Sequence, residues 1–209
     1  MNFLRDQTQE ESFDYSFLMS CLSQYKSPRS KVTHLLRSGE VIRVKKGLYV
    51  FGEKQRRSML SLEILANQIY GPSYVSCEYA LAFYGLIPEH VVEVTSVTTK
   101  KKKNYETPIC RFSYAPIPAR LFSTGFTLLQ VDDNKSALIA TPEKALADLL
   151  YIRRIKIKTP SDLEALLFED LRLDPTGVKK MHIGVLSDIL KAGGNPVLSL
   201  IINWLRGRK

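Results

Sequence analysis

The stretch from residue 27 to residue 39 has the apolar spacing of an amphipathic helix. Ser27 can cap this helix, Pro28 suits its first turn, and Gly39 suits the position just past its end. With about 100° between successive residues, apolar side chains gather on one face, and groups that can touch phosphates or base edges gather on the other. The apolar face holds Val32, Leu35 and Leu36, and the polar face holds Arg29, Ser30, Thr33, His34 and Arg37.

Two short strands are predicted directly after this helix. Residues 41–44 and 48–51 are rich in β-branched and aromatic side chains. The three residues between them are typical of a hairpin loop, with Gly47 in the left-handed conformation and two lysines at the tip. A helix with a polar outer face followed by a basic hairpin predicts a winged helix-turn-helix, which is a DNA-binding fold. We expect DNA contacts from the polar face of the helix and from Arg43, Lys45 and Lys46 in the hairpin.

The residues on either side of this unit predict a supporting helix and a linker. An apolar repeat at helical spacing begins at Phe13, and Asp14 can cap that helix. Residues 52–57 are polar and lack an apolar pattern, which indicates a linker. We therefore expect two domains, a winged helix-turn-helix with its linker over residues 1–57 and a second domain over residues 58–209.

The second domain is predicted to combine helices and strands. An apolar stripe ending at Gly71 and a segment that Ser76 can cap predict helices, and β-branched stretches at 91–99 and 109–114 predict strands. A capping residue followed by proline recurs four times and predicts helix starts at residues 142, 160, 175 and 196. The fold class is therefore α+β: an N-terminal winged helix-turn-helix, a mixed α/β domain and a C-terminal helical segment.

Charge is concentrated on the predicted helix and hairpin. The chain has 209 residues and a formal net charge of +9. Residues 26–57 contain ten Lys/Arg and two Glu, a net of 10 − 2 = +8, whereas residues 1–25 sum to −3, 58–150 to −1 and 151–209 to +5. Since nucleic-acid binding places basic residues on one element or face, this distribution favours double-stranded DNA as the partner.

Several other classes of protein are disfavoured. The three cysteines are far apart, which argues against a disulfide framework, and no apolar run approaches the length of a membrane helix. The residues near the start include several acids and do not resemble a signal peptide, so we expect a cytoplasmic protein without a membrane partner. No metal-ligand spacing, phosphate-binding loop or nucleophile motif is present. We therefore expect no enzyme activity, no cofactor and no metal.

Three features keep two interpretations each. The run Lys100–Lys103 fits either a contact to nucleic acid or an acidic partner, or a solvated turn. Cys77, beside Glu78 at a predicted helix start, fits either a thiol of lowered pKa or a small buried residue. A second basic cluster, with either a surface or a binding role, consists of Arg153, Arg154, Lys156 and Lys158.

Three segments resemble the AbiEi-type antitoxins. Residues 73–89, SYVSCEYALAFYGLIPE, resemble that family's "SYIS-x-x-SAL-x-x-hGLIPE" segment, and residues 139–148, IATPEKALAD, resemble "IATPEKAL-x-D". Residues 39–50, GEVIRVKKGLYV, resemble the family's wing, and the similarity runs in order over about residues 15–151. Tyr79 departs from the pattern, because the family usually carries serine there.

The resemblance implies a function for both domains. Members are antitoxins of type IV toxin–antitoxin pairs, and their winged helix represses their own operon at inverted repeats, where a homodimer would be expected on DNA. Their second domain counters a nucleotidyltransferase-like toxin, directly or indirectly. Transferred to this chain, the antitoxin surface would include Ser76, Glu78, Glu89, Glu143, Lys144 and Asp148.

Two other functions compete with a DNA-binding autorepressor and antitoxin. One is a plain winged-helix transcription factor whose second domain senses a ligand or only dimerises. The other is an enzyme that modifies nucleic acid and uses the winged helix for docking. A toxin-like reading frame next to the gene would favour the antitoxin, and a pocket of converging carboxylates or lysines would favour the enzyme.

Overall fold

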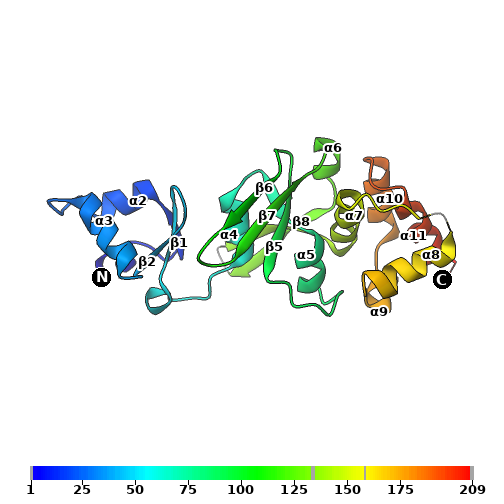
Figure 1. Ribbon diagram of the computed structural model, residues 1–209, viewed down its shortest axis with the longest axis horizontal. Coiled ribbons are helices and arrows are strands. Elements are labelled where there is room, and N and C mark those ends of the chain that lie inside the picture. Colours follow the sequence, from blue (N-terminus) through cyan, green and yellow to red (C-terminus); the bar gives the residue numbers. More distant parts are fainter. Residues whose placement is uncertain (1, 133–134, 158, 208–209) are drawn as a thin grey trace.

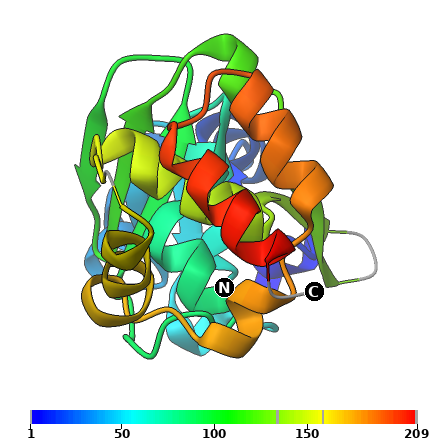
Figure 2. The ribbon, with the colours of Figure 1, turned by 90° about the vertical axis from the view of Figure 1, so that its right-hand side faces the viewer.

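The computed structural model describes residues 2–132, 135–157 and 159–207 as a mixed α+β fold. Figure 1 shows the chain advancing along the long axis of the molecule, from a small N-terminal sheet with helices, through a larger sheet, to a group of C-terminal helices. In Figure 2, which looks along that axis, the C-terminal helices α10 (Ile183–Lys191) and α11 (Val197–Arg206) lie in front. None of the described helices is long and apolar enough to cross a membrane.

The N-terminal part contains the predicted helices and hairpin together with one strand that the sequence did not reveal. Its three strands form an antiparallel sheet in the order β1-β3-β2. Strand β1 is too short to show an alternating pattern, and it pairs Ser12 with Val50. The elements are α1 (Asn2–Asp6), β1 (Ser12–Asp14), α2 (Tyr15–Cys21), α3 (Pro28–Arg37), β2 (Val41–Lys45) and β3 (Leu48–Phe51).

Strand β3 is buried on both faces. Tyr49 and Phe51 pack in a cluster with apolar residues of α2 and α3, whereas Leu48 and Val50 belong to the larger core of the molecule. This explains why the sequence of β3 is continuously apolar rather than alternating. The hairpin is therefore held between two cores, and it is not a free wing. A short 3-10 helix, Glu53–Gln55, follows within the predicted linker.

The larger sheet has six strands in the order β6-β7-β5-β4-β9-β8. The pairs β4–β9 and β5–β7 are parallel, and the other pairs are antiparallel. The parallel strands β5 and β7 are connected through β6, and β4 is separated from β9 in the sequence by β5 to β8. The strands are β4 (Ser73–Val75), β5 (Glu93–Thr98), β6 (Lys103–Glu106), β7 (Arg111–Pro116), β8 (Phe126–Asp132) and β9 (Lys135–Ala140).

Helices cover both faces of this sheet. Figure 1 shows α4 on the side of the N-terminal sheet, and α5 and α7 on the opposite side, where α7 in turn packs on α10. Thr141, Thr159 and Asp174 cap their helices as predicted, and Asn195 accepts a hydrogen bond from the Val197 amide at the start of α11. The remaining helices are α4 (Leu62–Ile69), α5 (Cys77–Phe83), α6 (Ala119–Phe122), α7 (Pro142–Ile152), α8 (Pro160–Glu164), the π-helix Ala165–Asp170 and α9 (Pro175–Lys179).

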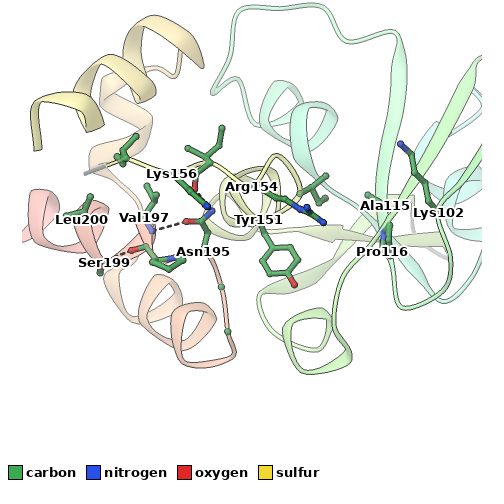
Figure 3. A pocket seen from close by; sticks show the side chains of 16 residues that line it. Lys102, Ala115, Pro116, Tyr151, Arg154, Lys156, Asn195, Val197, Ser199 and Leu200 are labelled. Carbon is green, nitrogen blue, oxygen red and sulfur yellow. Dashed lines mark hydrogen bonds between the residues drawn. The ribbon is translucent and has the colours of Figure 1, made fainter. Parts of the chain in front are cut away.

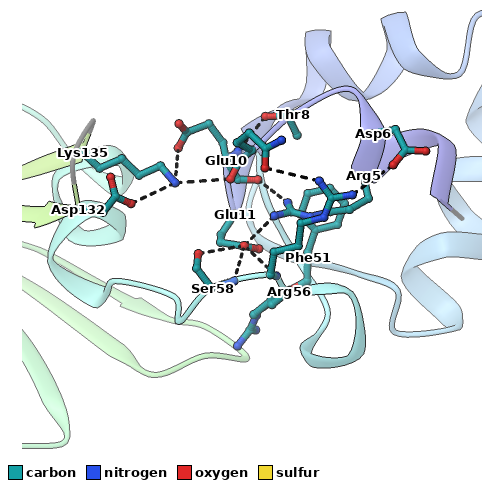
Figure 4. A network of polar contacts seen from close by, with 12 residues as sticks. Arg5, Asp6, Thr8, Glu10, Glu11, Phe51, Arg56, Ser58, Asp132 and Lys135 are labelled. Carbon is teal, nitrogen blue, oxygen red and sulfur yellow. Dashed lines mark hydrogen bonds and ion pairs between the residues drawn. The ribbon is translucent and has the colours of Figure 1, made fainter.

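A buried carboxylate joins the N-terminal segment to the chain that follows the hairpin (Figure 4). One oxygen of Glu11 accepts hydrogen bonds from the Arg5 guanidinium at 2.8 Å and from the Ser58 amide and hydroxyl at 3.0 and 3.1 Å. Nearby, the Lys135 ammonium of β9 lies 3.6 Å from a carboxylate oxygen of Glu10. Polar contacts therefore reinforce the apolar packing between the small and the large sheet.

Candidate nucleic-acid interface

Helix α3 separates its apolar and polar side chains as the sequence predicts. Val32 and Leu35 are buried, with 7% and 3% of their surface exposed, and Leu36 is partly buried. They pack in the small core with residues of α2 and the small sheet. The five residues of the opposite face, Arg29, Ser30, Thr33, His34 and Arg37, are all exposed.

The polar face of α3 has few internal partners. The Thr33 hydroxyl donates to the Arg29 carbonyl at 3.1 Å, and the Ser30 hydroxyl lies 2.8 Å from that of Ser27. The predicted capping by the Ser27 side chain is therefore wrong, because this hydroxyl bonds to Ser30 and not to a helix amide. Among the ion pairs of the described residues, none involves an arginine of α3. These guanidinium groups are free to bind an external anion.

The hairpin tip beside α3 confirms one prediction and modifies another. Gly47 has a φ of 87°, the left-handed conformation expected for the loop. Arg43 and Lys46 are exposed and take part in no ion pair within the described chain. Lys45, by contrast, is half-buried, and its ammonium donates to the Ile69 carbonyl at the end of α4. This side chain fixes the hairpin to α4. It does not extend into solvent, contrary to the prediction.

The run Lys100–Lys103 lies next to the hairpin tip. The Lys100 ammonium donates to the Gly71 carbonyl, and the Tyr70 hydroxyl donates to the Lys101 carbonyl at 3.2 Å. Both partners follow α4 directly, and Lys45 donates to the carbonyl of the last residue of α4, Ile69. Partial burial lowers the pKa of the Lys45 ammonium, and the nearby charge of Lys100 lowers it further. Lys100 and Lys103 lie over the rings of Tyr70 and Tyr105, which pack together, whereas Lys102 lines a groove elsewhere. Lys46, Lys100 and Lys103 therefore form one basic surface that crosses from the small sheet to the large one.

Most of the residues transferred as an antitoxin surface are buried. Ser76, Lys144 and Asp148 have no exposed surface, and Glu143 retains 4%. They belong to the packed interior between the sheet and α5 and α7. The prediction that these four residues form a surface is therefore wrong. The two remaining members, Glu78 and Glu89, are partly exposed.

The buried residues form a connected polar network. The Lys144 ammonium lies 2.6 Å from an Asp148 oxygen and donates to the Leu121 carbonyl at 2.9 Å. The other Asp148 oxygen accepts from the Ser76 and Tyr74 hydroxyls at 2.7 and 3.1 Å. Burial raises the pKa of Asp148, and the adjacent ammonium and hydroxyls oppose that rise by stabilising the anion. All four side chains are inaccessible, so the network is structural.

The other carboxylates of that prediction are paired. Glu78 accepts from Arg153 at 2.6 Å, Glu89 accepts from Arg172 at 2.7 Å, and buried Glu143 accepts from the His182 amide at the start of α10 at 2.8 Å. These contacts tie α5, α7 and the C-terminal helices together.

Cys77 and the second basic cluster separate into different environments. Cys77 is buried, and burial together with Asp148 raises the pKa of its thiol, which confirms the small buried residue and not the reactive thiolate.

Within the second basic cluster, Arg153 pairs with Glu78, while Arg154 and Lys156 line a groove. Lys158 lies outside the described residues. The sequence could not reveal this groove, because its walls come from four distant segments.

Neither a scan against protein-family models nor a search of curated proteins found a match. The similarity to AbiEi-type antitoxins therefore rests on the three segments described above. Within the described part of the chain, no three His, Cys, Asp or Glu side chains are grouped so that they could hold a metal ion.

Proposed function

We propose that this protein binds double-stranded DNA as a winged helix-turn-helix. Helix α3 would enter the major groove, and the hairpin tip would contact the adjacent backbone or minor groove. The observation that carries the proposal is the polar face of α3, which is exposed and whose arginines have no ion-pair partner in the described chain. The order of helices and strands and the sheet order β1-β3-β2 support the same fold.

The basic surface supports a footprint longer than α3 and the hairpin. Lys46, Lys100 and Lys103 continue it onto the large sheet. Lys100, and Lys45 beside Lys46, donate to carbonyls at or just after the end of α4. Because β3 is packed between two cores, the hairpin and the large sheet would meet DNA as one rigid surface. We expect phosphate contacts from Lys100 and Lys103 and base contacts from α3.

Binding to the protein's own upstream region tests the proposal. Replacing both Arg29 and Arg37 by alanine should weaken binding strongly, since each base-reading arginine is worth about 1–3 kcal/mol. The matched control removes two exposed lysines of equal total charge at the other end of the molecule, Lys179 and Lys180. Equal loss of affinity in both double variants would mean that net charge alone, and not the position of the arginines on α3, determines DNA binding. Unchanged affinity of the arginine variant would refute the role of α3.

The biological role that we propose is autorepression together with neutralisation of a nucleotidyltransferase-like toxin. Its support is the sequence resemblance. Co-expression with the product of the adjacent gene provides the test, and growth rescue by both the wild type and the Arg29, Arg37 double variant is expected. No rescue by the wild type would leave the alternative role, a transcription factor whose second part senses a ligand. A groove lined by Lys102, Arg154 and Lys156 favours that alternative, because it could hold an anionic ligand.

A further inference from the structure

A groove of ≈ 950 Å³ lies between the end of α7, the end of β7 and the start of α11 (Figure 3). Its apolar wall includes Ile152, Ile155, Val197 and Leu200. Its volume falls at the upper end of the range for small-ligand sites, about 300–1,000 Å³. Helix α11, which forms one wall, lies at the end of the long axis opposite α3 (Figure 1).

The polar lining of the groove is positively charged. Lys102, Arg154 and Lys156 contribute three cations, and its lining contains no carboxylate. None of the three forms an ion pair or a side-chain hydrogen bond with another described residue. The start of α11 lines the same groove, and the positive end of its helix dipole adds to the field. This arrangement favours an anion.

Arg154 occupies a backbone position that favours glycine. Its φ is 53°, and it follows α7 where the Ile155 amide bonds back to the Leu150 carbonyl at 3.1 Å, the pattern of a left-handed helix end. A side chain there is strained relative to glycine. Arg172 has a similar φ of 51°, but its side chain is used inside the protein, since it pairs with Glu89 at 2.7 Å. The strained Arg154 has no such partner in the described chain, and it lines the groove.

The shape of the groove is fixed before any ligand arrives. The Asn195 side-chain amide donates to the Leu150 carbonyl at 2.9 Å and to the Ile155 carbonyl at 3.0 Å. Its oxygen accepts from the Val197 amide at 2.9 Å. One buried side chain therefore clamps the end of α7 to the start of α11, and both walls keep their positions.

We propose that this groove binds a small organic phosphate with an apolar or aromatic body, of the size of a nucleoside polyphosphate. Three unpaired cations match a ligand with several negative charges, and the apolar wall matches the body that carries them. Arg154 would grip the phosphates bidentately, because its planar guanidinium fits their geometry. The proposal is independent of DNA binding.

Calorimetry on the full chain, with ATP, tripolyphosphate and adenosine as probes, tests the site. ATP should bind more tightly than either of the other two, because only ATP fills both halves of the groove. Arg154→Gly should weaken ATP binding about tenfold or more, as expected for a lost charge-assisted contact. The same variant should keep or raise the melting temperature, since glycine relieves the left-handed strain. Lys156→Ala should weaken ATP binding without raising the melting temperature.

Controls separate this site from the DNA-binding surface. The Arg29, Arg37 double variant should bind ATP like the wild type, whether or not it still binds DNA. Loss of ATP binding in that variant would assign the anion to α3 and overturn the proposal. Absence of ATP binding by the wild type, or equal ATP affinity of Arg154→Gly and wild type, would overturn it as well.

Discussion

The polar face of α3 and the network around Asp148 contain the same kinds of side chain but differ in what surrounds them. On α3, arginines and hydroxyls are exposed, and the arginines lack ion-pair partners in the described chain. Around Asp148, an ammonium and two hydroxyls are buried and point at one carboxylate. The comparison shows that a polar cluster indicates function only when its hydrogen-bonding and charge capacity is left unused.

The physical reason is desolvation. A buried charge loses its hydration, so it is tolerated only when partners inside the protein replace the lost water. Lys144 and Asp148 satisfy each other and the surrounding oxygens, which leaves them nothing to offer a toxin or a nucleic acid. The arginines of α3 keep their hydration until a phosphate or a base replaces it. Removing a residue should therefore affect folding in the network around Asp148 and DNA binding on the polar face of α3.

The largest effect is expected from Lys144→Met. This change leaves the Asp148 carboxylate buried without its cation, which should reduce the free energy of unfolding by about 3–5 kcal/mol. Urea unfolding followed by circular dichroism measures the loss. Adding Asp148→Leu to this variant should recover part of the stability, because the unpaired charge is then absent. A loss below about 1 kcal/mol in the single variant would contradict the structural role and reopen the search for a functional one.

Periodicity predicted the helix and hairpin well, because a single repeat determines which face of each element is apolar. Val32 and Leu35 are buried and Arg29 is exposed, as the helical spacing requires. Gly47 is left-handed as predicted, but β2 extends to Lys45, so two residues and not three separate the strands. Capping residues before proline located three helix starts, since a side-chain oxygen and a missing amide act locally.

Features that depend on distant segments were beyond the reach of the sequence. The amphipathic pattern of α7 could not show that α5 and α10 would also cover its polar positions, so Lys144 and Asp148 looked accessible. Adjacent Lys45 and Lys46 look equivalent until the end of α4 is placed beside the first of them. The groove is assembled from the β5–β6 turn, β7, the end of α7 and the start of α11, which share no local signal.

A smaller effect is expected at the tip of the hairpin. Gly47→Ala should lower stability by about 1 kcal/mol, because alanine is strained at a φ of 87° even though its Cβ meets no atom within 4 Å. Gly184→Ala in α10 is the matched control, since space is also free there and the φ is not positive. That change should raise stability by about 0.5–1 kcal/mol. Thermal unfolding of both variants checks the two signs, and a neutral Gly47→Ala would contradict the conformational argument.

The smallest effect concerns two neighbouring lysines. One of them is bonded inside the protein and the other is exposed, so they compare a used and an unused ammonium group at adjacent positions. Lys46→Gln should reduce the slope of log affinity against log salt by about 0.9, the contribution of one phosphate contact. Lys45→Gln should leave that slope unchanged, because its ammonium already donates to the Ile69 carbonyl. It should instead lower the free energy of unfolding by about 0.5–1.5 kcal/mol.

Titration of labelled DNA at several salt concentrations, together with urea unfolding of both variants, separates these effects. Because both substitutions remove one positive charge at adjacent positions, a change in the overall field would alter both slopes alike. Equally reduced slopes for the two variants would contradict the different roles assigned to Lys45 and Lys46. A reduced slope for Lys46→Gln alone would support a hairpin that stays fixed to α4 when DNA binds. Lys45 would then keep its hydrogen bond to Ile69 while Lys46 contacts a phosphate.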